Sequence, residues 1–432
     1  MVADKAETRR SNFWPHEKPT WDVYSKCIHC GLCLDQCPTY RALGMEMDSP
    51  RGRIYQIVQV DAGKLALGDS FVTHIDRCLG CLNCQSACPS GVSYGSLLER
   101  ARLQIEENYP RPWLGRRLRR HFYGKVLPSF ERLAWHARLV RFYQQSGLQG
   151  LARATGILKL LGVAELDALS PHIESSFSFN DLGEVYPAEG ERRGRVALLI
   201  GCIGSVAFAE LNRATIRVLN KNGVEVHIPP HQACCGALHL HAGLMDAARV
   251  QARCNIDAML SPEFDAIVTN AAGCGSTMKE YAALLQDDPA YAGRAAEFTA
   301  KTKDVNEYLA EIGLRQPKRK LEARVTYQDP CHLAHAQGVR AAPRQLLKHV
   351  GATLVESPRP DTCCGSAGVY NVAQNEISMK ILDEKMGFIS SVSPEIIATA
   401  NVGCMLQYRA GIERARMKAR VAHVIELLDE VY

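Results

Sequence analysis

Two copies of one cysteine pattern constrain the fold of this chain more than any other feature. Both read C-x2-C-x2-C-x3-C-P, and they run from Cys27 to Pro38 and from Cys78 to Pro89. In this pattern three closely spaced thiolates hold one [4Fe–4S] cluster, while the fourth cysteine ligates a second cluster. The sequence therefore predicts two clusters with crossed ligation. Their expected ligands are Cys27, Cys30, Cys33 and Cys88 for the first, and Cys78, Cys81, Cys84 and Cys37 for the second.

Structural zinc and disulfide bonds are the alternatives. Zinc sites use paired C-x2-C units and need neither a third cysteine two residues on nor a trailing Cys-Pro. The 17 cysteines would indicate disulfides in a short secreted protein, but this chain has 432 residues. Its residues 1–20, which we expect to form a flexible or partner-bound arm, lack the apolar segment of a signal peptide. Clustered cysteines in such a chain indicate metal ligands in a reducing cytoplasm.

Length and composition narrow the remaining classes. Two or three domains are expected from 432 residues, and a hydrophobic content of 47% can fill more than one core. The longest apolar run, Val196–Ala209, is shorter than a membrane-spanning helix. A net charge of +5 is modest and does not suggest nucleic acid as a partner. We therefore expect a cytoplasmic protein, with peripheral attachment to the cytoplasmic membrane left open.

Helix signals surround the two cysteine motifs. Ser49 can cap a helix and Pro50 can occupy its first turn, so a helix over Arg51–Val60 is predicted. A second helix is predicted over Tyr94–Asn108, where Tyr109-Pro110 ends it. Helical linkage between the motifs favours an α-helical ferredoxin-like domain, which we place at residues 1–110.

Residues 111–194 form a basic helical region followed by a polar linker. Residues 111–160 contain eleven Arg or Lys and one acid, Glu131, with large apolar side chains interleaved. A basic amphipathic helical stretch can lie on an anionic membrane surface. The alternative is a helical linker whose arginines dock on an acidic partner or are solvated. Residues 165–193 are polar, with scattered Pro and Gly, and are interpreted as an inter-domain linker.

The remainder of the chain is duplicated. Each half carries a single cysteine, then a Cys-Cys-Gly triplet, then another single cysteine, and corresponding cysteines are 129 or 130 residues apart. We place the two cysteine-rich repeats at residues 195–320 and 321–432. Their candidate metal ligands are Cys202, Cys234, Cys235 and Cys274 in the first repeat, and Cys331, Cys363, Cys364 and Cys404 in the second.

Apolar strands alternate with helices in both repeats, which predicts α/β domains with parallel sheets. The expected strands are Val196–Ile200, Val224–Ile228 and Phe264–Thr269, then Arg324–Tyr327 and Glu395–Ala400. Cysteines just past strand ends should gather along one sheet edge, so each set of four could bind iron–sulfur or zinc, or stay an inert buried group. We favour iron–sulfur in the second repeat, because Asp329–His332 and Gly365–Gly368 give it a polar, glycine-rich surround.

The remaining cysteine and the neighbouring histidines are assigned structural roles. Cys254 has no counterpart in the second half and is expected to be a core thiol on a helix over Asp246–Leu260. Four histidines close to the candidate ligands are interpreted as helix caps or structural side chains. They are His239, His241, His332 and His335.

Together these elements resemble the iron–sulfur subunits of glycolate oxidase. That family lies in a wider group with lactate-utilisation, glycerol-3-phosphate dehydrogenase and heterodisulfide reductase subunits. The stretches Asp48–Ile54, Gly273–Tyr281 and Cys363–Tyr370 look like the glycolate branch in particular. The whole resemblance covers Cys27–Ile54, Asp76–Gly95, Gly201–Cys202, Ala233–Gly236, Ala271–Tyr281, Asp361–Tyr370 and Asn401–Gly411.

The resemblance implies a ferredoxin-like domain, two cysteine-rich "CCG" domains and a complex with FAD-binding subunits that oxidise glycolate to glyoxylate. This chain would pass electrons from the partner FAD to a quinone or another acceptor. It has no G-x-G-x-x-G opening a βαβ unit, so FAD is expected on the partners only and no catalytic residue is assigned here.

Three other functions are left open. The complex could oxidise lactate or another 2-hydroxy acid, the cysteine-rich repeats could reduce a disulfide or quinone, or they could be a zinc-stabilised scaffold. The heterodisulfide reductase module ends in C-x2-C, whereas the matching positions here are Thr277 and Gln407. Its non-cubane cluster is therefore not carried over, and disulfide reduction loses support with it.

Overall fold

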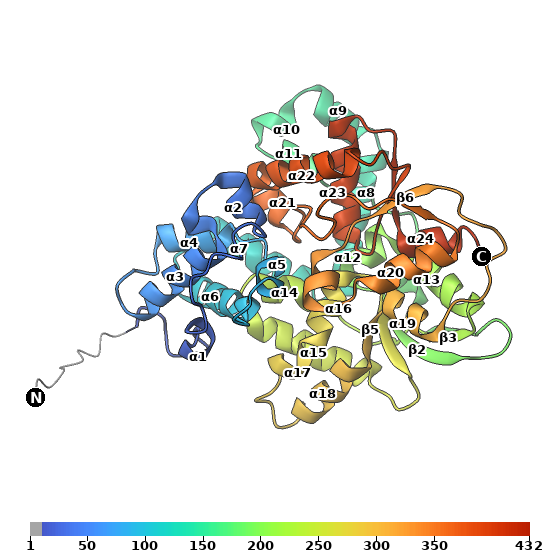
Figure 1. The fold of residues 1–432 in the computed structure, drawn as a ribbon, viewed down its shortest axis with the longest axis horizontal. Helices are drawn as coiled ribbons and strands as arrows, with labels where there is room; N and C mark the ends of the chain where they lie inside the picture. Colours follow the sequence, from blue (N-terminus) through green and yellow to red (C-terminus); the bar gives the residue numbers. More distant parts are fainter. Residues whose placement is uncertain (1–10) are drawn as a thin grey trace, which may run out of the picture. The chain divides into compact units, whose positions relative to one another are not determined.

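The computed structural model describes residues 11–432, which form two compact units (Figure 1). The first contains the chain up to Pro112 together with Leu238–Met245, and the second contains Trp113–Ala237 and Asp246–Tyr432. Among residues 11–432, no helix combines the length and apolar character needed to cross a lipid bilayer.

Between residues 11 and 112 the regular structure is helical. The elements are α1 (Trp21–Tyr24), α2 (Pro38–Leu43), η1 (Glu46–Asp48), α3 (Pro50–Asp61), α4 (Asp69–Asp76), α5 (Asn83–Ser86) and α6 (Tyr94–Asn108). Helices α3, α4 and α6 supply much of one apolar core, for example through Ile57, Phe71 and Leu97. The predicted α-helical domain is confirmed, and α6 has the predicted bounds.

The start of α3 follows from its sequence. The Ser49 hydroxyl accepts a hydrogen bond from the Gly52 N–H (3.0 Å), and Pro50 occupies the first position, where no N–H is needed. Gly52 is required by packing, because a Cβ there would lie 2.0 Å from the Glu46 carbonyl oxygen. The helix is therefore fixed against the 3₁₀ turn η1 that precedes it.

The predicted N-terminal arm is wrong for residues 11–20, and its first ten residues lie outside the described part of the chain. Phe13 is buried in the core of the first unit. The Asn12 N–H donates to the Val60 carbonyl (3.0 Å), and the Trp14 N–H donates to Gln104 Oε1 (2.8 Å). These contacts satisfy backbone groups that a free arm would leave to water.

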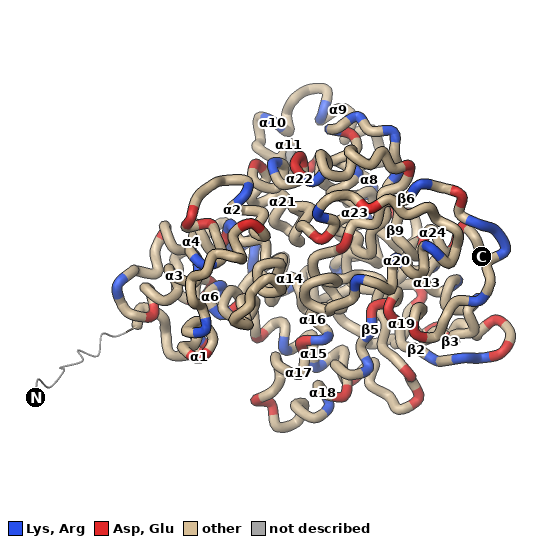
Figure 2. Tube along the Cα trace, viewed as in Figure 1, with Lys and Arg blue, Asp and Glu red and all other residues tan. Residues whose placement is uncertain are grey.

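A series of short helices opens the second unit. They are α7 (Trp113–His121), the π-helical turn η2 (Phe122–Val126), α8 (Phe130–Gln145), α9 (Leu148–Ala154), α10 (Ile157–Leu160), α11 (Ala164–Ala168) and η3 (Ser178–Asp181). Figure 2 marks their Lys and Arg positions in blue, for example around α9 and α10. Residues 165–175, predicted as a linker, fold back on this layer: Arg153 pairs with Asp167 (2.6 Å), and Gln144 donates to the Pro171 carbonyl (2.9 Å).

The first cysteine-rich repeat is built on a five-stranded sheet in the order β1-β3-β2-β4-β5. Its elements are β1 (Val185–Tyr186), β2 (Gly194–Leu199), α12 (Cys202–Ala207), α13 (Ala209–Lys221), β3 (Val224–His227), α14 (Ala237–His241), α15 (Met245–Met259), β4 (Ala266–Thr269), α16 (Ala272–Lys279), α17 (Tyr281–Leu284), α18 (Ala292–Lys301), β5 (Thr302–Asp304) and α19 (Val305–Ile312). Strand β1 pairs antiparallel with β3, so this sheet is mixed and not wholly parallel as predicted.

The second repeat has a fully parallel sheet in the order β7-β6-β8-β9. Its elements are β6 (Arg324–Tyr327), the π-helical turn η4 (His332–Ala336), α20 (Ala341–His349), β7 (Thr353–Leu354), α21 (Tyr370–Ala373), α22 (Asn375–Ser390), β8 (Ile396–Thr399), α23 (Val402–Ala415), β9 (Arg420–His423) and α24 (Val424–Asp429). The order matches β3-β2-β4-β5 of the first repeat, as a duplication requires.

The two repeats exchange their last helices. Helix α24, at the end of the second repeat, packs on α13 of the first, and α19, at the end of the first, packs on α20 of the second. Arg217 of α13 binds Asp429 of α24 through 2.7 Å and 3.1 Å contacts. Each repeat therefore completes its neighbour's helical layer, so the second unit contains a mutually dependent pair.

Candidate functional site

The first cysteine set lines a surface hollow of about 440 Å³ in the first unit, here called the outer hollow. Ile28, Pro50, Ile54 and Val92 contribute apolar wall. Cys30 is exposed, and its neighbours Ile28 and Leu32 are 69% and 59% exposed. The outer hollow thus brings together the predicted first set from both motifs, which is Cys27, Cys30, Cys33 and Cys88.

The second set lines a smaller hollow of about 290 Å³, here called the inner hollow. It is lined by Cys37, Cys78, Cys81 and Cys84, and all four are buried. Pro50, Tyr94 and Cys84 border both hollows, so the two share a wall. Two thiol-lined hollows that share a wall, with Cys84 bordering both, suit two neighbouring iron–sulfur clusters.

Left-handed backbone coils the two loops around their thiols. In the first motif His29 (φ 54°) and Gly31 (φ 85°) flank Cys30, and in the second Gly80 (φ 66°) and Leu82 (φ 60°) flank Cys81. Each motif therefore places two left-handed residues around its second cysteine, one of them a glycine. Non-glycine residues adopt this conformation at a cost and commonly at functional sites.

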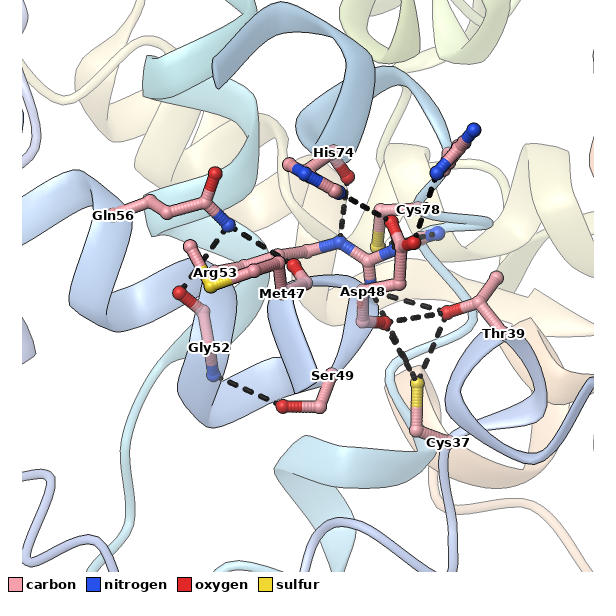
Figure 3. Close-up of polar contacts among 12 residues, drawn as sticks. Cys37, Thr39, Met47, Asp48, Ser49, Gly52, Arg53, Gln56, His74 and Cys78 are labelled. Carbon is pink, nitrogen blue, oxygen red and sulfur yellow. Dashed lines mark hydrogen bonds and ion pairs between the residues drawn. The ribbon is translucent and has the colours of Figure 1, made fainter. Parts of the chain in front are cut away.

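A buried polar network forms one side of the inner hollow (Figure 3). The Arg53 guanidinium donates to the His74 carbonyl (2.7 Å) and to Thr39 Oγ1 (3.1 Å). Asp48, fully buried, contacts His74 Nδ1 (2.9 Å) and Arg77 (3.0 Å). Sequence reasoning missed this network because Asp48–Arg53 was interpreted as a helix start and as part of the family resemblance, with no buried charge expected. The available signal was the pair of opposite charges, Asp48 and Arg53, at a helix start between the two cysteine motifs.

The pKa values of two thiols in the inner hollow are shifted in opposite directions. Burial raises the pKa of Cys84 well above its usual range, and the neighbouring thiols add to the effect. Burial acts in the same direction on Cys78, but the charges of Arg53 and Arg102 outweigh it and lower the pKa of that thiol. The donors present, four convergent thiols including Cys78 with its lowered pKa, fit an iron–sulfur cluster.

The cysteines of the first repeat converge beyond the carboxyl ends of β2, β3 and β4. Cys202 and Cys234 lie 3.5 Å apart at their sulfurs, and hydrogen bonds between neighbouring thiols continue from Cys234 to Cys235 and Cys274. Neutral groups hold the Cys-Cys turn. Asn255 donates to the Cys234 carbonyl (3.0 Å), and the Tyr281 hydroxyl donates to the Cys235 carbonyl (2.8 Å).

The second repeat repeats the convergence with different surroundings. Its thiols form a chain of hydrogen bonds, which joins Cys331, Cys363, Cys364 and Cys404. His332 Nδ1 lies 3.4 Å from Cys331 Sγ. The buried Lys385 ammonium donates to the carbonyls of Arg359 (2.9 Å) and Pro360 (2.8 Å) behind the Cys-Cys turn.

Both repeats thus bring four thiols together as pairwise neighbours. Within residues 11–432, no three His, Cys, Asp or Glu side chains form a ready-made site for one metal ion. The other histidines lie on α14 (His239 and His241) and on η4, where His335 contacts the Asp361 carbonyl (3.0 Å). The prediction for Cys254 is wrong: this thiol is exposed, because it lies on the outer face of α15 beside the buried Asn255.

Family models cover most of the chain. A "4Fe-4S dicluster domain" matches residues 23–92, and a "Glycolate oxidase iron-sulfur subunit, linker region" matches residues 114–170. A "Cysteine-rich domain" matches twice, at residues 196–279 and 325–409. The two-cluster domain and the duplicated cysteine-rich domains predicted from the sequence are confirmed.

Similar proteins match along most of the length. The "Probable glycolate oxidase iron-sulfur subunit" of Bacillus subtilis (strain 168) is 40% identical over 412 residues, 94% of this chain and 93% of that protein. The "Glycolate oxidase iron-sulfur subunit" of Escherichia coli (strain K12) is 32% identical over 416 residues, 94% of both chains. "Lactate utilization protein A" of Geobacillus kaustophilus (strain HTA426) is 30% identical over 237 residues, 54% of this chain and 98% of that protein.

Proposed function

Because this chain belongs to the family of glycolate oxidase iron–sulfur subunits, we propose that it receives electrons from FAD-binding partner subunits that oxidise glycolate to glyoxylate. A subunit of such an enzyme complex works with other subunits, and this one carries a domain for two [4Fe–4S] clusters. Each bound cluster supplies a one-electron centre, so the pair matches the two electrons that oxidation of a 2-hydroxy acid releases.

One observation supports the crossed ligand assignment. Each hollow is lined by three cysteines of one motif and by the last cysteine of the other, Cys88 in the outer hollow and Cys37 in the inner. Cys84 also borders the outer hollow, yet its own motif partners Cys78 and Cys81 line the inner hollow alone. We therefore assign Cys27, Cys30, Cys33 and Cys88 to one cluster, and Cys78, Cys81, Cys84 and Cys37 to the other.

Ligand variants of the full chain test this assignment. Cys37→Ser should damage the cluster held by the second motif, and Cys88→Ser, the matched control, should damage the cluster held by the first. Iron and sulfide content with electron paramagnetic resonance would follow each cluster. Loss confined in each variant to the cluster of the mutated motif would contradict crossed ligation.

The outer hollow is the better point of exchange with the flavin-bearing partner. Its Cys30 is exposed, whereas all four thiols of the inner hollow are buried. Electron transfer slows with distance, so the cluster nearer the surface is the first acceptor.

The purified chain alone should contain iron and sulfide, bind no FAD and oxidise no glycolate. Stoichiometric flavin in the lone chain would contradict the proposal.

The electron acceptor and the substrate depend on the partners. We propose a quinone or another acceptor beyond this chain. Lactate or another 2-hydroxy acid is the second candidate substrate, which the similarity to a lactate utilization protein favours. Assays of the purified complex with glycolate, lactate and longer 2-hydroxy acids would rank them by kcat/KM.

The second repeat is proposed to hold a further iron–sulfur cluster. Its four thiols converge, and Lys385 and His332 lie beside them, so thiolates that ligate a cluster would have positive or polarisable neighbours. A zinc-stabilised scaffold and a disulfide- or quinone-reducing site are the alternatives. In the full chain, Cys363→Ala with Cys364→Ala should remove iron that Cys234→Ala with Cys235→Ala leaves in place. Zinc in that position would identify a scaffold.

Helix α7 is proposed to lie on an anionic lipid surface. None of its residues is buried, Trp113 and Leu118 are 71% and 61% exposed, and four arginines lie between them or just beyond. Vesicles with anionic lipid should bind the chain, vesicles of neutral lipid should not, and salt should weaken binding. Replacing Arg116, Arg117, Arg119 and Arg120 with Gln should release the protein. If neither treatment matters, α7 docks on a partner subunit instead.

A further inference from the structure

Arg53 is the largest fully buried side chain in the described part of the chain, with 1% of its surface exposed. It extends from α3 into the wall of the inner hollow. Its Nη1 lies 4.0 Å from Cys37 Sγ, and Cys78 lies on the other side of the guanidinium in the view of Figure 3. A permanent positive charge therefore stands among thiols that line this hollow.

One donor of this guanidinium is unused. Arg53 Nη2 is buried and has no hydrogen-bond acceptor among the described residues, and the closest charged oxygen, Asp48 Oδ1, is 3.5 Å away. A buried donor without a partner is costly and rare in native proteins. A sulfur-rich anionic group in the inner hollow would give this donor an acceptor.

The charges around the inner hollow leave a positive excess. Asp48 is shared by Arg53, Arg77 and His74, so one carboxylate faces two guanidiniums. Arg102 adds a third, held by its 2.6 Å hydrogen bond to the Cys78 carbonyl. At the outer hollow, the corresponding lining arginine is Arg51, which is partly exposed and pairs with Glu46 (2.6 Å). Solvent screens that pair far more than it screens the buried one.

We propose that the Arg53 guanidinium, with Asp48 as its counter-charge, sets the reduction potential of the cluster held by the inner hollow. The inference rests on the proposed ligand assignment for Cys37, Cys78, Cys81 and Cys84. Reduction adds one electron and no proton, so it adds one negative charge at the centre. A buried positive charge beside it stabilises the reduced form, and a buried negative charge disfavours it. Arg53 is thus a positioning and tuning residue that makes the buried centre easier to reduce.

Potentiometric titration of the full chain, purified with its iron and sulfide, tests this proposal. Dithionite is the reductant, and electron paramagnetic resonance follows the clusters. Arg53→Gln should shift the potential of the inner cluster downward, and Arg53→Lys, which keeps the charge, should shift it less. Asp48→Asn should shift the same potential upward. Arg51→Gln, the matched control at the outer hollow, should leave the inner cluster unchanged.

Opposite shifts of the reduction potential in Arg53→Gln and Asp48→Asn would support the proposal, because general structural damage would not shift the potential in opposite directions in the two variants. Iron and sulfide retained in both variants, with the potential unmoved or moved in one direction, would overturn it while leaving the proposed function intact. If Arg53→Gln does not fold, the comparison is made between Asp48→Asn, where an upward shift is expected, and Arg53→Lys, where a small downward shift is expected. Failure of the proposed ligand assignment gives a different result, since Cys37→Ser would then leave the inner cluster intact.

Discussion

The two cysteine-rich repeats share a sheet order and four converging thiols, but they differ in the groups behind those thiols. At positions 130 residues apart, Asn255 donates to the Cys234 carbonyl of the first repeat, and Lys385 donates to the Pro360 carbonyl, three residues before the Cys-Cys turn of the second. Before the first cysteine, Ile200 corresponds to Asp329, which binds Arg344 through 2.7 Å and 2.8 Å contacts. The repeats share the strand order and the four thiols, whereas the second has buried charge near them.

This difference changes the electrostatic surroundings of the thiols in the two repeats. A buried ammonium is costly, and burial lowers the pKa of Lys385 to about 8 against the opposing influence of Cys364 and Asp329. Such a group is useful where thiolates must be stabilised. The neutral amide and hydroxyl of the first repeat instead fasten a backbone turn. The second repeat thus has a buried positive charge near its thiols, where the first repeat has a neutral amide and hydroxyl.

Exchanging the two supporting residues should give the largest effect. Asn255→Lys removes the acceptor for the Ala233 N–H (2.8 Å) and buries a charge among neutral groups, at a cost of about 3–5 kcal/mol. Lys385→Asn leaves the Arg359 and Pro360 carbonyls short of a donor, at a cost of about 2–3 kcal/mol. Urea unfolding of the full chain measures both, with the exposed Cys254→Ser as control. Equal costs would show that charge does not separate the repeats.

The helix caps of the two repeats should respond to pH in opposite directions. Asp304 caps α19 and His423 caps α24, and both are buried. Burial raises the pKa of Asp304 from 3.8 to about 6, so its stabilising contribution is present below pH 3.8 and is lost as pH rises to about 6. Burial lowers the pKa of His423 from 6.5 to about 4, so its contribution is present above pH 6.5 and is lost as pH falls.

Each effect is worth about 3 kcal/mol, and in the native chain they largely offset each other. In Asp304→Asn only the effect of His423 remains, so the free energy of unfolding should fall as the pH is lowered from 6.5 to 4.5. His423→Asn should leave the Asp304 trend, so unfolding free energy rises over the same interval as the pH falls. Denaturant titrations at several pH values check both slopes. Parallel slopes in the two variants would remove the contrast.

The buried ion pair of the second repeat should be replaceable by the first repeat's apolar residue. Arg344→Met leaves the Asp329 carboxylate buried without its partner and should cost about 2 kcal/mol. Adding Asp329→Ile, which restores the residue type of Ile200, should recover most of that loss. A double-mutant cycle by urea unfolding measures the coupling. No recovery in the double variant would mean that the pair has a further role beside the thiols.

The smallest effect is expected at the exchanged helices. Asp429 and Arg217 form an ion pair between α24 and α13, but Arg217 is 42% exposed. Asp429→Asn should therefore cost less than about 1 kcal/mol and lose its effect in high salt. Thermal unfolding at two salt concentrations would measure it. A larger, salt-independent loss would show that the two repeats are joined by charge more than by apolar packing.

Local patterns predicted much of this fold because they act over a few residues. Cysteine spacing predicted the two thiol sets, and Ser49 and Pro50 predicted the start of α3. The antiparallel β1 was not predictable, since two residues carry no period and its pairing with β3 depends on tertiary context. The exposure of Cys254 was predictable, because the buried positions of α15 follow the helical period and Cys254 lies off that stripe.

Buried charge was the larger omission at the site. Arg53 and Lys385 look like ordinary helix-surface cations in the sequence, and only their contacts show that each is buried beside a thiol set. Burial of such a group depends on partners distant in the chain, here His74 for Arg53 and Arg359 for Lys385. Patterns of polarity along one helix cannot reveal those partners.

The exchange of final helices has a consequence for synthesis. The packing on helix α13 (residues 209–221) is complete only after residues 424–429 have been synthesised, because these residues form α24, which packs on α13. The first repeat is therefore synthesised with a helix surface that stays uncovered until residues 424–429 follow. Domains generally fold in the order in which they are translated, but these two must finish together. A nascent chain stalled before residue 424 would be a natural substrate for chaperones and proteases.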